Sequence, residues 1–191
     1  MSVLRKGTRK NLPSASAAKR GESNFVLAFG RAYLKRYGKP NGHSSYLPAR
    51  EFQVSGFGVA DFIWFVWRSE SRKEEGSALE YRSRLRLGES LLAFEMKLRD
   101  WRKALGQAYR YRYFANAAYV VLPRKAASTA KLNLEVFQQL GVGLWSFDKN
   151  TGVIRRIYSP RRRSPLSSKA RERAVLTLAR LVKFPQAAGR A

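Results

Sequence analysis

The sequence predicts an α/β protein with a mixed central β-sheet flanked by helices. Two observations predict it: short apolar runs rich in β-branched and aromatic residues recur along the chain, and segments with helical spacing of apolar residues separate them. Such an alternation of strands and helices is typical of layered α/β folds. No internal repeat is visible, and 191 residues are enough for one domain with a core of its own.

The first half of the chain predicts one helix and two strands. Apolar residues recur at helical spacing over about 22–37, and Gly38 follows them as a stop signal. The segment 47–67 is rich in β-forming residues and is interrupted by glycine, which predicts a β-hairpin or two consecutive strands. The stretch 68–88 carries charges of both signs, so we expect an exposed insertion or a pair of extended hairpin arms there.

The second half predicts alternating strands and helices. An apolar run at 91–98 fits a buried strand, and a helical face follows it from Trp101 to Ala115. The remaining elements expected in order are a strand at 118–122, a helix at 129–140, a strand at 142–147, a turn at 148–152, a short strand at 153–158 and a C-terminal helix around 175–182.

The composition excludes several classes of protein. Hydrophobic residues make up 45% of the chain, which is too many for a wholly disordered protein, and no run reaches the roughly 18 apolar residues that a membrane helix needs. The absence of cysteine excludes a disulfide framework, thiolate zinc sites and a cysteine nucleophile. His43 is the single histidine and lies in a turn-like stretch, which argues against a Ser-His-Asp triad and favours a loop histidine at this position.

The charge predicts a polyanionic partner. Lys and Arg number 38 against 13 Asp and Glu, a net charge of +25, so DNA or RNA is expected first and an anionic membrane surface second. The distribution predicts a flexible basic arm at 1–21, a core domain at 22–158 and a basic C-terminal extension with a helix at 159–191. We expect a cytoplasmic, nucleoid-associated protein. An Arg- and Ser-rich start without acids is also typical of organelle targeting, which stays as the alternative.

The candidate catalytic residues lie in the third expected strand. Glu95 and Lys97 must project from one face of that strand, because side chains alternate, while Phe94 and Met96 project from the other. Burying a charged pair costs free energy of folding, so such a pair in an apolar strand indicates a functional role. If the preceding strand is a neighbour, Asp61 and Glu95 can converge on a hard cation such as Mg²⁺, with the Met96 carbonyl as a further oxygen ligand. Lys97 would then stand beside the attacking water and offset charge at a phosphate.

This constellation resembles the PD-(D/E)XK nuclease superfamily, which has the restriction-endonuclease-like fold. Gly58-Val59-Ala60-Asp61 is similar to its Asp strand, and Glu95-Met96-Lys97 is similar to its (D/E)XK strand. The following helix carries Gln107 and Tyr111, similar to the Gln-x-x-x-Tyr motif of RecB-like members. The resemblance covers about residues 22–147. Alanine stands where many members have proline before the Asp, and 34 positions separate Asp61 from Glu95.

The resemblance implies a Mg²⁺-dependent nuclease, with Mn²⁺ as a possible substitute, that hydrolyses phosphodiester bonds in DNA. Asp61 and Glu95 would hold the metal, with help from Glu22 on the first helix, while Glu51 is a weaker competitor for that third position. Lys97 would assist the water, and Gln107 with Tyr111 would position the scissile phosphate. The residues expected to contact nucleic acid are Arg102, Lys103, Arg110 and Arg112. By analogy with relatives that cut two strands, we expect a homodimer.

Several alternatives stay open. The enzyme can be a restriction-type endonuclease, a junction resolvase or a nuclease that processes transposon or phage ends. Asp61 and Lys97 can instead form a structural salt bridge in a catalytically silent nucleic-acid-binding protein on the same fold. A basic RNA-processing or ribosome-associated protein is a more distant reading. The four basic residues of the helix after the metal strand can equally be a solvated surface.

Overall fold

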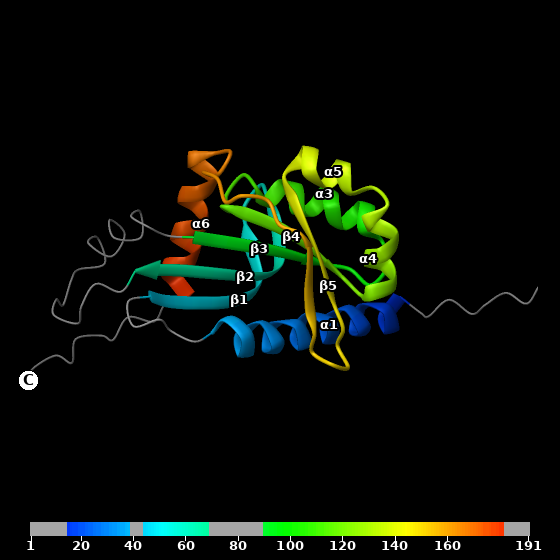
Figure 1. Ribbon diagram of the computed structural model, residues 1–191. Helices are drawn as coiled ribbons and strands as arrows, with labels where there is room; N and C mark the ends of the chain where they lie inside the picture. Colours follow the sequence, from blue (N-terminus) through cyan, green and yellow to red (C-terminus); the bar gives the residue numbers. More distant parts are fainter. Residues whose placement is uncertain (1–14, 39–43, 69–89, 182–191) are drawn as a thin grey trace, which may run out of the picture.

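Six strands and the helices around them form the described part of the chain, residues 15–38, 44–68 and 90–181 of a computed structural model (Figure 1). The α/β prediction, a mixed sheet flanked by helices, is confirmed. The elements are α1 (Ala15–Tyr37), β1 (Ser44–Val54), β2 (Gly58–Arg68), β3 (Ser90–Met96), α3 (Trp101–Tyr111), β4 (Ala117–Leu122), α4 (Arg124–Lys131), α5 (Leu134–Leu140), β5 (Val142–Phe147), β6 (Ile154–Tyr158) and α6 (Ser168–Leu181).

The sheet follows the order of the chain, β1-β2-β3-β4-β5-β6. The β1–β2, β2–β3 and β5–β6 pairs are antiparallel, whereas β3, β4 and β5 run parallel, with helices in their connections. Parallel strands need such crossover connections. The carboxyl ends of β3, β4 and β5 therefore lie at one edge of the sheet, together with the start of the antiparallel strand β2.

The two faces of the sheet carry different cores. α1 covers one face through an aromatic cluster, in which Phe29 contacts Phe62, Phe94 and Phe147 at ring-centroid distances of 5.5–5.8 Å. The opposite face is covered by α3 to α6, whose buried side chains are alanines and leucines together with the aromatic rings of Trp101, Tyr111 and Phe137 (Figure 1). Close approach of α3 is possible because Ala104 and Ala108 face the sheet. The sheet is therefore buried on both sides, which suits its apolar strands.

Two helices differ from the sequence prediction. α1 begins at Ala15 rather than near residue 22, and the alanine-rich start of that segment has the high helix propensity that this extension needs. The single helix expected at 129–140 is wrong, because α4 and α5 are separate helices that meet at Leu132 and Asn133. The folded unit also continues past residue 158, since α6 buries apolar residues against the sheet.

Other expectations lie outside the described residues. These are the charged stretch 68–88, apart from the end of β2, most of the basic arm at 1–21, and His43. Within residues 15–38, 44–68 and 90–181, no helix combines the length and apolar character needed to cross a bilayer.

Gly143 is required by a close approach inside the sheet. A Cβ atom there would lie 2.2 Å from Cδ1 of Tyr119, whose ring stacks on Phe94 in the core. Gly143→Ala is therefore expected to lower the free energy of unfolding by about 1–3 kcal/mol, measured by urea denaturation. Gly106→Ala is the control: a Cβ at this exposed position in α3 meets nothing within 4 Å, and the change should stabilise the helix by about 0.5–1 kcal/mol. Equal effects of the two substitutions would contradict the packing argument.

Candidate active site

Asp61 and Glu95 lie opposite each other on neighbouring strands. The antiparallel register pairs Phe62 with Phe94, so the next position along each strand brings the two acids together on the face that α3 covers. Asp61 is fixed further because its Oδ2 accepts a hydrogen bond of 2.7 Å from the backbone N–H of Met96. The sequence places these two carboxylates together only if their strands are neighbours, and β2 and β3 do pair in the structure.

Glu95 is the most deeply buried acid of the group and is held from two sides. Its side chain is 1% exposed, and Lys97 Nζ lies 2.8 Å from Glu95 Oε1. The Tyr111 hydroxyl lies 2.5 Å from Glu95 Oε2 and 2.5 Å from the Val59 carbonyl oxygen. A hydroxyl has one proton, so Tyr111 donates to one of these acceptors at a time, and the ionised carboxylate is the stronger one. Both oxygens of Glu95 are thus oriented by α3 and by the end of β3.

Lys97 stands where β3 has ended, between the acids of the sheet and the first helix. Its ammonium group lies 3.3 Å from the Met96 carbonyl oxygen and 3.8 Å from Glu22 Oε2, in addition to its contact with Glu95. The lysine side chain is 15% exposed, so the ammonium is in a position to meet both the protein carboxylates and a bound substrate.

Asp61, Glu95, Glu22 and Lys97 form a cluster in which acidic side chains outnumber the single ammonium group. Burial raises the pKa of Asp61, although the hydrogen bond from Met96 opposes this. Burial also raises the pKa of Glu95, and the nearby charge of Asp61 adds to the effect. Burial alone would lower the pKa of Lys97, but the hydrogen bond to Glu95 and the surrounding carboxylates outweigh it and raise the pKa. One ammonium therefore faces several acids in a protein whose net charge is +25.

Two further acids lie near the pair. Glu22 approaches from α1, and its charge raises the pKa of Asp61. Glu51 stands opposite Asp61 in the β1–β2 register, has a similar effect on that pKa, and adopts a left-handed backbone conformation with φ of 50°. Nothing in the linear pattern favours Glu51, because its position across from Asp61 depends on the register of the hairpin. An alternating pattern over both strands was the only signal that could have indicated it.

Gln107 and Tyr111 lie one helical turn apart on α3, as the motif implies, but they differ in surroundings. Tyr111 is 1% exposed, and burial together with Glu95 raises its pKa, so this hydroxyl orients Glu95 and is not accessible to a phosphate. Gln107 is half-buried, and its Oε1 has no hydrogen-bond partner within the described part of the chain. That oxygen is shielded from solvent, so Gln107 would have to turn its amide outward to meet a ligand.

The donor set fits a divalent cation that prefers oxygen ligands. Asp61 and Glu95 offer carboxylates whose pKa values are raised, and a bound cation would lower these pKa values by stabilising the ionised forms. The Met96 carbonyl and Glu22 are further oxygen donors, and both lie close to Lys97. In residues 15–38, 44–68 and 90–181, no three His, Cys, Asp or Glu side chains are close enough to form a complete metal cage. Such a cation would need water or substrate oxygens besides the protein ligands, as is common for Mg²⁺.

The four basic residues predicted to contact nucleic acid have different environments. Lys103 and Arg110 are exposed on α3, and Arg102 lies with its guanidinium 4.4 Å from the centre of the Trp101 ring. Arg112 is half-buried and donates a 2.6 Å hydrogen bond from Nη1 to the Leu140 carbonyl oxygen at the end of α5. Arg112 thus has a structural partner, whereas the other three leave their charged groups accessible.

Arg112→Ala is expected to lower the free energy of unfolding by about 1–2 kcal/mol, because it leaves the carbonyl at the end of α5 without its charged donor. Arg110→Ala, which removes the same charge from an exposed position of the neighbouring turn, should change stability by less than about 0.5 kcal/mol. Chemical denaturation of both variants measures the difference. Equal stabilities would show that the contact with Leu140 contributes nothing.

Comparison with models of protein families and with curated proteins finds no match for this chain.

Proposed function

We propose that the protein is a metal-dependent nuclease with a restriction-endonuclease-like core that hydrolyses phosphodiester bonds in DNA. The observation that carries the proposal is the convergence of Asp61, Glu95 and Lys97 at the edge of the sheet where β3 ends. A carboxylate pair beside an ammonium group is suited to phosphoryl chemistry, in which positioning and charge stabilisation do most of the work. The contacts of Tyr111 and Glu22 with the same group support it.

The residues of the chain have distinct tasks in this proposal. Asp61 and Glu95 would hold Mg²⁺, which when bound supplies Lewis-acid activation of water and of the phosphate. Lys97, which Glu95 orients, donates hydrogen bonds to the incoming water and to the phosphate oxygen on which charge builds up. Tyr111 keeps Glu95 in place. Gln107, whose amide oxygen is buried without a partner in the described residues, would turn this oxygen outward to accept a hydrogen bond from the water or from the substrate.

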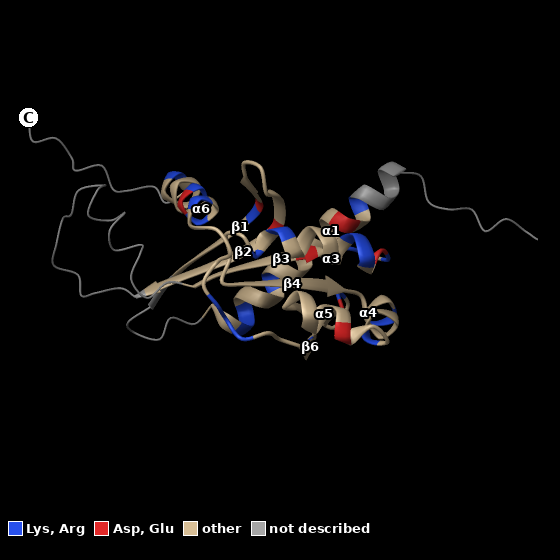
Figure 2. Cartoon of the chain, turned by 90° about the horizontal axis from the view of Figure 1, so that it is seen from above, with Lys and Arg blue, Asp and Glu red and all other residues tan. Residues whose placement is uncertain are grey.

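The surface charge supports a polyanionic substrate. Figure 2 shows acidic segments close together where α1, the strands and the start of α3 meet, with Lys and Arg spread over the surrounding helices. This arrangement attracts a polyanion to the basic helices and brings it close to the acids at which a cation can bind. Binding through many phosphate contacts weakens steeply with salt, because counterions are released on association.

The experiment that tests the proposal is incubation of the purified protein with supercoiled plasmid, single-stranded DNA and a four-way junction, each with Mg²⁺ or with EDTA. We expect cleavage of at least one substrate with Mg²⁺ only, and the substrate that is cut distinguishes the types of nuclease left open above. Lys97→Ala should abolish this cleavage while leaving most of the salt-sensitive affinity.

Lys131→Ala is the matched control, because it removes an exposed lysine from the end of α4 and should cut as the parent protein does. Tight, salt-sensitive binding without cleavage of any substrate would replace the proposal by a catalytically silent DNA-binding protein. Cleavage that persists in Lys97→Ala would show that another site is responsible.

A further inference from the structure

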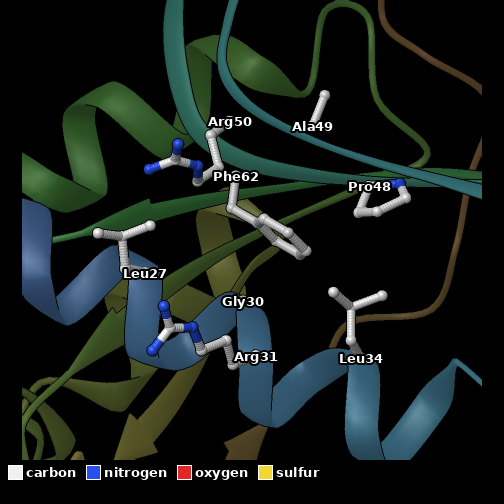
Figure 3. A pocket seen from close by; sticks show the side chains of 8 residues that line it. All are labelled: Leu27, Gly30, Arg31, Leu34, Pro48, Ala49, Arg50 and Phe62. Carbon is white, nitrogen blue, oxygen red and sulfur yellow. The ribbon is translucent and has the colours of Figure 1, made fainter.

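A hollow of about 240 Å³ lies between α1 and the β1–β2 hairpin, outside the group of acids (Figure 3). Its floor and one end are apolar and are formed by Leu34, Pro48, Ala49 and Phe62. Apart from the two arginines discussed below, the side chains that line it contain no hydrogen-bonding group. Such a surface can bind a flat aromatic or an aliphatic group by apolar contact, without selecting it through hydrogen bonds.

Two arginines from opposite walls share the other end of the hollow. Figure 3 shows the guanidinium groups of Arg31, on α1, and Arg50, on β1, both turned toward the end where Leu27 lies. Both side chains are exposed, and in residues 15–38, 44–68 and 90–181 neither has an ion-pair or hydrogen-bond partner. Two like charges that face one end of a cavity without an acid between them are complementary to an anion, and guanidinium groups bind phosphate oxygens in a fork.

The hollow is next to the proposed cleavage centre in the fold. Arg50 precedes Glu51 and Phe62 follows Asp61, but successive side chains of a strand point to opposite faces, so the hollow lies on the face that α1 covers and the two acids of β2 and β3 lie on the other. On α1, Leu27 lies between Glu22 and Arg31, which places the charged end of the hollow nearer the acids than the apolar end. Glu22 of the same helix lies 3.8 Å from Lys97 at the end of β3, so a DNA strand held at the acids can reach the hollow around this end of the sheet.

The geometry points to a subsite for one nucleotide of an unpaired DNA strand, with its phosphate between Arg31 and Arg50 and its base against the apolar wall. This inference rests on the proposed function, and it deepens it by naming the substrate class: DNA with a single-stranded segment beside the cut. In a duplex the bases are stacked and paired inside the helix, whereas an unpaired base can leave the stack and lie on an apolar surface.

Binding of a short fluorescent oligo-dT in EDTA tests the phosphate position, because no cleavage occurs under that condition. Arg31→Ala and Arg50→Ala should each weaken binding about tenfold, and the double variant should be little weaker than either single one, since both hold one phosphate. Arg180→Ala, on α6 at the opposite face of the sheet, removes an exposed arginine from elsewhere and is the control (Figure 1). Its effect should be small and should add to that of Arg31→Ala. Additive losses for the Arg31 and Arg50 pair, or no loss, would overturn the inference.

Gly30 tests the apolar wall without changing charge. A Cβ on Gly30 would lie 3.6 Å from the Phe62 ring, an ordinary contact, so Gly30→Ala should fold and bind normally, whereas Gly30→Leu should fill the hollow. We expect Gly30→Leu to weaken oligo-dT binding at least about fivefold with the same salt dependence, and to leave binding of an abasic strand unchanged. Equal weakening for both strands would exclude a base from the hollow.

The two proposals can fail separately. Mg²⁺-dependent cleavage together with independent, additive arginine effects would leave the nuclease and remove the subsite. Coupled arginine effects without cleavage of any DNA would leave the subsite and remove the catalytic proposal. Absence of any binding to oligo-dT would overturn the subsite directly.

Discussion

Asp61→Asn is expected to reduce DNA cleavage by about a thousandfold or more while leaving the fold intact. The asparagine oxygen can still accept the hydrogen bond from Met96, so the start of β2 stays attached to the end of β3. The substitution removes the negative charge that a divalent cation needs. It also removes a buried charge that raises the pKa of Glu95, so the metal-free variant should be at least as stable as the parent protein.

Thermal unfolding with and without Mg²⁺ separates this role from a structural one. At a Mg²⁺ concentration a hundredfold above its dissociation constant, binding stabilises the folded state by about 2.7 kcal/mol, which for a chain of this size raises the melting temperature by roughly 5–10 °C. We expect that increase for the parent protein and for Asp148→Asn, the control, and none for Asp61→Asn. Asp148 lies in the turn between β5 and β6, where the same change keeps a hydrogen-bond acceptor. An equal increase in Asp61→Asn would exclude Asp61 as a ligand.

Phe29→Ala is expected to lower the free energy of unfolding by about 3–5 kcal/mol. Phe29 is fully buried and contacts the rings of Tyr33 on its own helix and of Phe62, Phe94 and Phe147 on three strands. Its removal leaves a cavity between α1 and the sheet that these rings cannot all move inward to fill. The predicted loss corresponds to a fall of roughly 6–20 °C in melting temperature.

Leu132→Ala provides the comparison for that loss, because Leu132 is 82% exposed between α4 and α5. Its removal should change the free energy of unfolding by less than about 0.5 kcal/mol. Urea denaturation of both variants, with unchanged slopes, measures the difference. A loss below 1 kcal/mol for Phe29→Ala would contradict the central place of this ring in the core.

The central strands β3, β4 and β5 were predictable because burial on two faces makes them almost continuously apolar. The expected hairpin at 47–67 corresponds to β1 and β2, and the run at 91–98 corresponds to β3. α4 was not predictable in the same way. It buries only Ala127 and Ala130, and such small residues give a weak apolar periodicity that the sequence pattern does not reveal.

The candidate site was predictable where it depends on a single strand and not where it depends on packing. Alternation along β3 places Glu95 and Lys97 on one face without any further information. The approach of Tyr111 to Glu95 depends on how α3 lies across the sheet, and the unpaired arginines of the hollow depend on the spacing between α1 and β1. These distances follow from the volumes of many side chains together, which a linear pattern does not contain.

The aromatic packing under α1 has a consequence for how the chain reaches its native state. Phe25 and Phe29 belong to the first helix, but their partner Phe147 is supplied by β5, more than a hundred positions later, and Arg36 of the same helix bonds the Ile154 carbonyl. Contacts so distant along the chain slow folding. Until β5 has joined the sheet, the part of the apolar stripe of α1 that packs on Phe147 stays exposed to solvent, and such surfaces associate at high concentration. Dilute refolding should therefore give a higher yield of monodisperse protein than concentrated refolding.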